Sequence, residues 1–398
     1  MTNDPLAGLD DVPWAELRHS YGRADDVPGL LRAMRAGDSE GPYPPSTRLA
    51  NHVVHQGTRS QAAAHTVPFL VRMALDPEQA HRHRLVALLT AIAIGLDNNH
   101  LPNGYHPRED RDCLDSLRGE ADEQARWIAE AADDEEREER AAMCEQVLVD
   151  AEAVVLSYDT VRKALPALAA LLTSDSPELR AGTANLFAWF PESAATSVPR
   201  LKAFVTAEAS PGAAATGLVA LGLLGDPTAA PFVESHLDSP AVELRWASAF
   251  ALIRLGITGP PVVDALVEVV ARPPESTGTM TFLSGSYGGL AAMALAETPE
   301  ATTPRAVEAM LAGLADCKGA ERYHDRYYTA SRLFTLVFPD THAAAPRSFA
   351  DLNDAQQRVL RFLAARHSDG WPTDGMDALR HWKVPTDHSD LRAYVGSA

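Results

Sequence analysis

The sequence predicts an all-α protein, an α-solenoid of stacked helix pairs, and three observations lead to this prediction. The chain of 398 residues is 46% hydrophobic but only 7% aromatic, and it is rich in alanine, which favours helices over strands. Pro166, Pro199, Pro231 and Pro261 follow one another at intervals of 33, 32 and 30 residues, a period typical of repeated helix pairs. Short phrases of Asp, Ser and Pro between them mark turns and helix caps.

The recurring prolines are expected to open the first helix of each pair. Each follows a small or apolar residue and precedes an apolar helical pattern, and earlier copies of the phrase stand at Pro28 and Pro68. Proline is tolerated in the first turn of a helix because its missing N–H would have no intrahelical partner there. A weaker copy begins at Pro304.

The second helix of each pair has a signature of its own. Asp175–Pro177 breaks the chain before Leu179 and Arg180. Asp238–Pro240 breaks the chain in the same way before Leu244 and Arg245. Because Asp, Ser and Pro are typical of turns and caps, we expect a second helix to follow each phrase.

These phrases resemble HEAT repeats, most clearly over residues 160–260. In that family an aspartate in the turn and an arginine early in the second helix form a ladder that ties the repeats together. The resemblance implies that Asp175 pairs with Arg180, and that Asp238 pairs with Arg245. It also implies a right-handed α-solenoid of HEAT-like helix pairs, with roughly six to eight pairs in the chain.

Two further segments resemble uncharacterised actinobacterial HEAT-repeat proteins. One covers residues 52–70, with its two histidines and the Gln-Gly-Thr that follows them. The other lies near the end of the chain, with Trp371, Leu379 and Val384-Pro385. This resemblance names no activity.

The repeat pattern and its interruptions divide the chain into four parts. We expect N-terminal HEAT-like repeats over residues 1–96, a polar loop and acidic helical insertion over 97–160, a HEAT-like repeat array over 161–345 and a C-terminal capping segment over 346–398. Loops inserted into repeat arrays tend to gather on one face, which is often the binding face. The interruptions are therefore the places where a site is expected.

The chain is strongly acidic, with a formal net charge of −19 from 54 acidic and 35 basic residues. Such a surface repels phosphate backbones, which argues against general nucleic-acid binding. Residues 109–145 hold fifteen acidic and five basic side chains, with the densest block at Glu135, Glu136, Glu138 and Glu139. We expect a charged helix there, either a solvated face or a docking strip for a basic partner.

The cysteines and the N-terminus favour a cytoplasmic protein. Cys113, Cys144 and Cys317 form no C-x-x-C pair and are odd in number, so a disulfide framework is not expected. The first residues lack the charged-then-apolar pattern of a signal peptide. No run of about 18 apolar residues predicts a membrane span.

Polar and aromatic residues gather where the repeat is interrupted. Tyrosine offers a large contact area with a polar tip, and histidine can change protonation near neutral pH, so both suit recognition. The predicted binding residues are Asp97, Asn98, His100, Tyr105, His106, Tyr287, Tyr323, His324, Tyr327 and Tyr328. We expect the loop of residues 97–106 to lie near residues 323–328.

No complete metal-binding or catalytic motif occurs in the sequence. Zinc needs three or four converging ligands, whereas His52 with His55 and His81 with His83 are only pairs. Neither a metal nor a cofactor is therefore expected. The phosphate loop G-x-x-x-x-G-K-[ST] and the nucleophile motif G-x-S-x-G are both missing, so no catalytic residue is assigned.

These observations favour a binding protein over an enzyme. We expect a scaffold, adaptor or inhibitor-like protein that binds a protein or peptide, with a basic partner where the acidic helix docks, and with neither nucleic acid nor membrane as a partner. The alternative is an enzyme whose pocket is built from loops 97–107, 281–289 and 323–328. Three loops converging on one deep polar pocket would favour the enzyme, and a shallow open groove would favour the scaffold.

Overall fold

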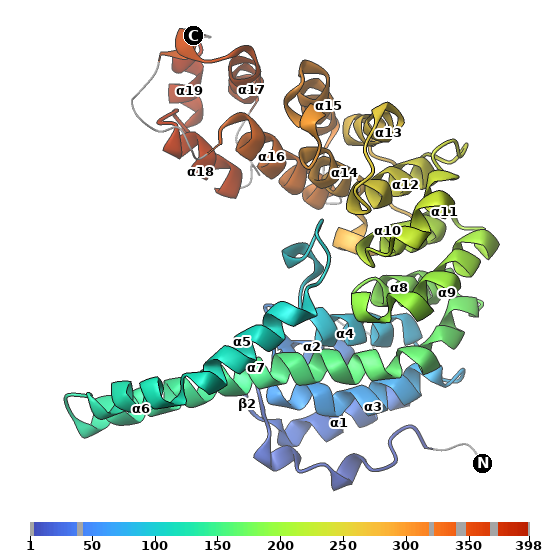
Figure 1. Ribbon diagram of the computed structural model, residues 1–398, viewed down its shortest axis with the longest axis vertical. Coiled ribbons are helices and arrows are strands. Elements are labelled where there is room, and N and C mark those ends of the chain that lie inside the picture. The colour runs from blue at the N-terminus through green and yellow to red at the C-terminus, as the bar shows by residue number, and fades with distance from the viewer. Residues whose placement is uncertain (1–3, 38–42, 318–321, 340–347, 367–372, 397–398) are drawn as a thin grey trace. The chain divides into compact units, whose positions relative to one another are not determined.

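The computed structural model describes residues 4–37, 43–317, 322–339, 348–366 and 373–396 (Figure 1). About 73% of the chain is helical, so the prediction of an all-α protein is confirmed. Trp371, one of the residues of the C-terminal resemblance, lies outside the described residues. Among the described helices, none is both long enough and apolar enough to cross a bilayer.

The helices and strands alternate with short turns along the chain. The strands are β1 Arg18–His19, β2 Gly22–Arg23, β3 Val54–His55 and β4 Thr58–Arg59. The α-helices are α1 Val27–Gly37, α2 Pro45–Val53, α3 Gln61–Leu75, α4 Arg82–Ile94, α5 Pro107–Gly119, α6 Ala121–Ala129, α7 Asp134–Leu168, α8 Pro177–Phe187, α9 Ala194–Ala207, α10 Pro211–Leu223, α11 Ala230–Glu234, α12 Val242–Arg254, α13 Pro260–Ala271, α14 Tyr287–Ala296, α15 Pro304–Asp316, α16 Tyr323–Val337, α17 Asp354–Ala364, α18 Thr373–His381 and α19 His388–Tyr394.

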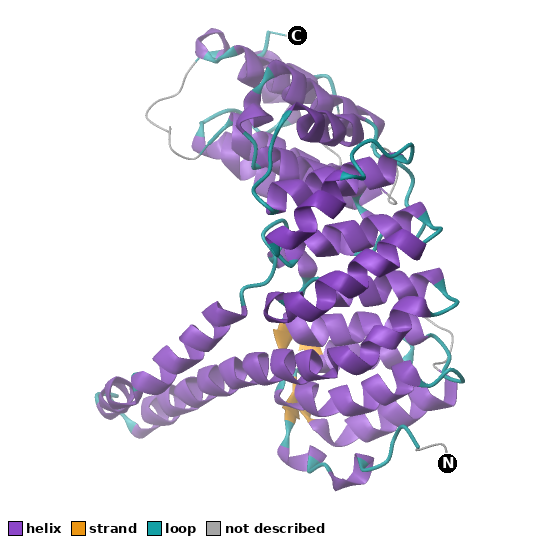
Figure 2. Ribbon diagram, turned by 45° about the vertical axis from the view of Figure 1, so that its right-hand side comes forward, coloured by secondary structure: helices purple, strands orange, loops and turns teal. Residues whose placement is uncertain are grey.

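The chain forms two compact units. The N-terminal unit consists of Met1–His100 and Gly104–Arg200, and the C-terminal unit of Leu101–Asn103 and Leu201–Ala398. In the N-terminal unit α3 packs against α4 and α7, and α4 packs against α8. The two β-hairpins, drawn as orange strands in Figure 2, also belong to this unit.

An acidic arm, which we define as residues 107–147, extends from the N-terminal unit. In Figures 1 and 2, α5 and α6 run beside the first half of α7 and reach away from α1–α4. The charged helix expected over residues 109–145 is therefore three helices. The last of them begins where the side chain of Asp133 accepts a hydrogen bond from the Glu136 N–H at 2.8 Å, a helix cap that lets the chain turn back on itself.

The helices of the C-terminal unit pack closely because small residues stand at their crossings. A Cβ atom at Gly222 on α10 would lie 2.5 Å from Cα of Ala251 on α12. A Cβ atom at Gly313 on α15 would lie 2.0 Å from the carbonyl oxygen of Val270 on α13. A larger side chain at either position would push the paired helices apart.

Three of the predicted helix starts are wrong and four are confirmed. Pro28, Pro231, Pro261 and Pro304 lie in the first turn of α1, α11, α13 and α15. Pro68, Pro166 and Pro199 instead lie inside α3, α7 and α9. These helices begin earlier, for α3 at the end of a hairpin and for α7 at the Asp133 cap, so the prolines only delete one hydrogen bond within each helix.

The arginines of the implied ladder hold backbone carbonyl groups. Arg180 Nη1 donates to the carbonyls of Ser174 at 2.7 Å and Asp175 at 3.2 Å. Arg245 Nη1 donates in the same way to Ser239 at 2.9 Å and Pro240 at 3.1 Å.

The acidic partner of Arg245 is Glu268 on α13, which accepts from Arg245 Nη2 at 2.8 Å, so the pairing with Asp238 is wrong. The Asp238 side chain is exposed, because it lies in a turn that points into solvent. The arginine therefore ties α12 both to the preceding turn and to α13.

Candidate functional site

Both β-hairpins and the middle of α7 enclose a polar cavity of about 580 Å³ in the N-terminal unit. The second hairpin turns through Gln56 and Gly57, which have φ angles of 51° and 89°. Two left-handed residues in a two-residue turn are the arrangement whose twist matches paired strands. This turn places His55 and Arg59 at the wall of the cavity.

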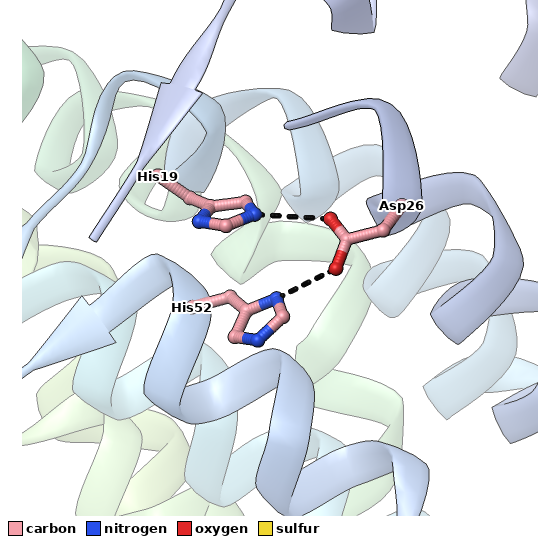
Figure 3. A group of neighbouring side chains, drawn as sticks. All are labelled: His19, Asp26 and His52. Atoms are coloured by element: carbon pink, nitrogen blue, oxygen red, sulfur yellow. Dashed lines mark hydrogen bonds and ion pairs between the residues drawn. The ribbon is translucent and has the colours of Figure 1, made fainter. Parts of the chain in front are cut away.

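Beside the cavity, His19, Asp26 and His52 form a cluster (Figure 3). His19 Nε2 lies 3.0 Å from one carboxylate oxygen of Asp26, and His52 Nδ1 lies 3.2 Å from the other. The imidazole rings of His19 and His52 stack with their centroids 4.3 Å apart. The His19 side chain is only 5% exposed, whereas Asp26 is 44% exposed, so the carboxylate connects the buried histidine to solvent.

The hydrogen bonds of His19 argue against a metal centre at this cluster. The Tyr21 N–H donates to His19 Nδ1 at 3.0 Å, so the proton of the neutral ring lies on Nε2 and is donated to Asp26. A metal-bound histidine instead donates from its second nitrogen. Without His19, only Asp26 and His52 remain, fewer than the three or four ligands that zinc requires.

The Asp26–His52 pair can accept a proton at His52. Burial lowers the pKa of His52, and this effect exceeds the opposite effect of Asp26, so the ring is neutral near pH 7. The contact of Nδ1 with Asp26 is close but poorly aligned for a hydrogen bond. Figure 3 shows the other ring nitrogen turned away from Asp26. In a catalytic triad the carboxylate orients its histidine through a hydrogen bond, and the Asp26–His52 contact lacks that alignment.

Tyr105 and His100, two of the predicted binding residues, pack against each other within the N-terminal unit. Tyr105 is 4% exposed and stacks on Tyr158 with ring centroids 5.0 Å apart. Its hydroxyl donates to Asp110. Burial raises the pKa of Tyr105, so the phenol stays protonated.

The His100 and Tyr105 rings form a T-shaped pair with centroids 4.8 Å apart, and a His100 ring nitrogen lies 2.8 Å from the Ile94 carbonyl oxygen. Burial lowers the pKa of His100. The remaining predicted residues of this segment lie nearer the surface: Asp97 and Asn98 are half-buried, and His106 is exposed at the start of α5.

The predicted residues 323–328 form the first turns of α16 rather than a loop. Tyr323 is 46% exposed and stacks on Tyr327 at 5.8 Å, and His324 stacks on Tyr328 at 6.2 Å. These stacked rings belong to the C-terminal unit, whereas His100 and Tyr105 belong to the N-terminal unit. Their expected proximity therefore stays a prediction.

A second cavity, of about 300 Å³, lies in the C-terminal unit between the segment before α14 and the start of α16. Ser284, Ser286, His324 and Asp325 line it. Asp325 is 8% exposed and accepts from Ser286 Oγ at 2.7 Å and from the Gly288 N–H at 2.8 Å. Two of the three predicted loop segments, 281–289 and 323–328, thus meet at one cavity.

Tyr287, predicted to bind a partner, is 1% exposed and packs against Trp246 with ring centroids 5.0 Å apart. Its hydroxyl is buried without a hydrogen-bond partner among the described residues. Burial raises the pKa of Tyr287, so the phenol stays neutral inside the helix layer. The side chain therefore fills the core beneath the cavity of the C-terminal unit.

Comparison with known proteins adds little to this geometry. No family model and no curated protein matches the chain. Among solved structures, an engineered protein is similar at 19% identity over 94% of this chain and 98% of that chain, with a TM-score of 0.27. A functional assignment therefore depends on the residues of this chain alone.

Proposed function

We propose that this protein is a HEAT-like helical-repeat protein, a right-handed α-solenoid, that binds a basic protein or peptide through its acidic arm. The repeat interpretation is supported by caps that recur before second helices. Ser176 and Ser210 accept hydrogen bonds from the third residue of α8 and α10 at 3.2 Å and 3.5 Å. The matching carbonyl contacts of Arg180 and Arg245 support it as well.

The charge of the arm is largely available to a partner. Glu135, Glu138 and Glu139 are exposed and form no ion pair with any described residue. Glu136 differs, because it accepts from the Ala132 N–H at 2.7 Å and pairs with Arg140 at 2.6 Å. Three glutamates are therefore free for a cationic partner, whereas Glu136 stabilises the turn between α6 and α7.

Apolar side chains stand beside these glutamates, and they are the observation that favours a protein partner over a simple solvated face. Met143 is 59% exposed, Val147 is 46% exposed and Trp127 is 39% exposed. The Arg140 guanidinium lies 4.8 Å from the centre of the Trp127 ring. Arg140, Met143 and Val147 recur at helical spacing and therefore share a face of α7. The arm thus carries exposed apolar side chains next to exposed carboxylates.

Charge and apolar area contribute differently to such an interface. The carboxylates attract a cationic partner and speed its encounter. The tryptophan and its apolar neighbours supply the contact area that anchors protein interfaces. A basic amphipathic helix combines both complementary features, and we propose this kind of segment as the partner.

Binding of a defined peptide to the full chain tests the proposal. A synthetic helix of about 18 residues, with lysines on one face and leucines on the other, is titrated by fluorescence anisotropy. Replacing Glu135, Glu138 and Glu139 by lysine is expected to weaken binding about tenfold or more, at roughly 0.2–1 kcal/mol for each ion pair lost and similar amounts for the repulsion introduced. Raising the salt concentration is expected to weaken binding to the unmodified chain.

Two controls separate the arm from general electrostatics. Lysine at Glu234, Asp238 and Glu300, which are exposed acids of the C-terminal unit, changes the net charge equally and is expected to leave binding nearly unchanged. A peptide of lysine and serine with the same charge is expected to bind more weakly than the leucine peptide. Equal losses in both triple variants, or equal binding of both peptides, would contradict the proposal.

The second candidate function is an enzyme, favoured by the cavity where segments 281–289 and 323–328 meet. Ser284 is exposed there and has a left-handed backbone with φ 55°, a conformation that is rare outside glycine and is concentrated at functional sites. His324 lines the same cavity. Labelling of Ser284 by a fluorophosphonate would support this candidate, and an unlabelled chain would count against a serine nucleophile.

A further inference from the structure

The cavity of the N-terminal unit carries positive charge in a chain that is strongly negative. Arg18 and Arg59 line it, together with His55. Among the described residues that line the cavity, Asp150 is the sole carboxylate, and it already accepts from Gln146 at 2.8 Å. The charged side chains at the cavity wall are therefore mainly positive, although the chain as a whole has a net charge of −19.

Arg59 is buried without a direct anionic partner. It is 8% exposed. Its Nη1 donates to the carbonyl of Gly57 at 2.8 Å and its Nη2 to the Tyr105 hydroxyl at 3.4 Å. Asp110 is reached only through that hydroxyl, and Nε has no partner among the described residues. A buried guanidinium held by neutral oxygens is costly unless an anion is supplied.

Neighbouring donors complete a set that suits an oxyanion. The Ser60 hydroxyl at the cavity wall is buried and has no partner in the described part of the chain. The Gln61 side-chain oxygen accepts from the Arg18 N–H at 3.1 Å, which leaves its amide N–H groups available. The Arg18 guanidinium is exposed and makes no ion pair with a described residue, so it is free to move onto a ligand.

We propose that this cavity binds a small molecule bearing a phosphate or carboxylate group, with Arg18 and Arg59 as its charged contacts. Guanidinium groups bind both oxyanions through paired, charge-assisted hydrogen bonds. The cavity volume of about 580 Å³ lies within the range of about 300–1,000 Å³ that is usual for small-molecule sites. The ligand would compensate the charge of Arg59 and give the Ser60 hydroxyl an acceptor.

Calorimetric titration of the full chain at constant ionic strength tests this proposal, with inorganic phosphate and succinate as separate probes. Binding of either probe is expected, and the tighter one identifies the preferred oxyanion. Arg18→Gln is expected to lower that affinity at least about tenfold, since a charge-assisted contact is lost. Its melting temperature without ligand should stay unchanged, because the exposed Arg18 guanidinium makes no hydrogen bond or ion pair with a described residue.

Arg48→Gln is the matched control, because Arg48 is an exposed arginine of the same unit outside the cavity. It removes the same charge and is expected to keep the affinity within about twofold, as exposed charges several ångströms away are screened. Failure of both probes to bind at millimolar concentration would overturn the proposal. Binding that Arg18→Gln leaves intact, or that Arg48→Gln weakens equally, would overturn it too.

Discussion

Replacing Arg245 by alanine is expected to destabilise the C-terminal unit, because this side chain joins three parts of it. Its guanidinium holds the carbonyls of Ser239 and Pro240 in the turn before α12. It also reaches Glu268 on α13. Alanine removes all of these contacts at once and leaves the two carbonyls without their donor.

The size of the effect follows from the exposure of each contact. A hydrogen bond to a charged group contributes about 1.5–3 kcal/mol when it is buried, and the Arg245 side chain is 25% exposed, so the carbonyl contacts lie at the lower end. Glu268 is 49% exposed, and an ion pair of this kind adds at most about 1 kcal/mol. The free energy of unfolding is therefore expected to fall by about 1–3 kcal/mol.

Hydrogen exchange measured by mass spectrometry on peptides of α12 and α13 reads this change locally. Protection there is expected to decrease in Arg245→Ala, while peptides of the N-terminal unit stay unchanged. Glu268→Ala is the control, because it removes only the exposed ion pair and should cost less than about 1 kcal/mol. Unchanged protection in Arg245→Ala, or an equal loss in both variants, would refute the reasoning.

Three further predictions concern packing, pH and metals. Gly313→Ala should lower the denaturant midpoint strongly, since its Cβ would meet a carbonyl at 2.0 Å, whereas Gly119→Ala, with open space around it, should not. Burial lowers the folded-state pKa values of His52, His65, His83 and His100. The free energy of unfolding should therefore be full above about pH 6.5 and should fall as the pH drops toward these lowered values, because the unfolded chain then binds more protons. Chemical denaturation from pH 7.5 to 5 tests this. Zinc should not raise the melting temperature through the His19–Asp26–His52 cluster, because His19 Nε2 carries a proton; an increase that is lost in His52→Gln would contradict this tautomer.

The fold class was predictable because it depends on local signals. Alanine-rich helices, serine caps and prolines act within a few residues, and the sequence shows them directly. The prediction was wrong where an earlier signal determined the start of a helix. Pro68 and Pro166 lie inside α3 and α7, since α3 follows directly on a hairpin and α7 begins at the Asp133 cap.

The candidate site was less predictable because its residues meet through non-local contacts. In the sequence, His52 and His55 stood out as a pair. Nothing in the sequence indicated that the first hairpin would bring His19 onto His52, with their ring centroids 4.3 Å apart, or that Asp26 would join them. The hairpin signal was present in Gln56-Gly57, between residues typical of strands. Tyr105 and Tyr287 were predicted from composition to bind a partner, which stays a prediction; their burial depends on non-local packing that composition does not show.

Photo-crosslinking of the lysine–leucine peptide to the full chain tests the proposed arm function most directly. With a benzophenone on its leucine face, the peptide is expected to attach within residues 120–147, near Trp127 and Met143. Lysine at Glu135, Glu138 and Glu139 should remove these crosslinks. Crosslinks that lie mainly outside the arm, or that persist in the triple variant, would contradict the proposal that the arm binds a basic partner.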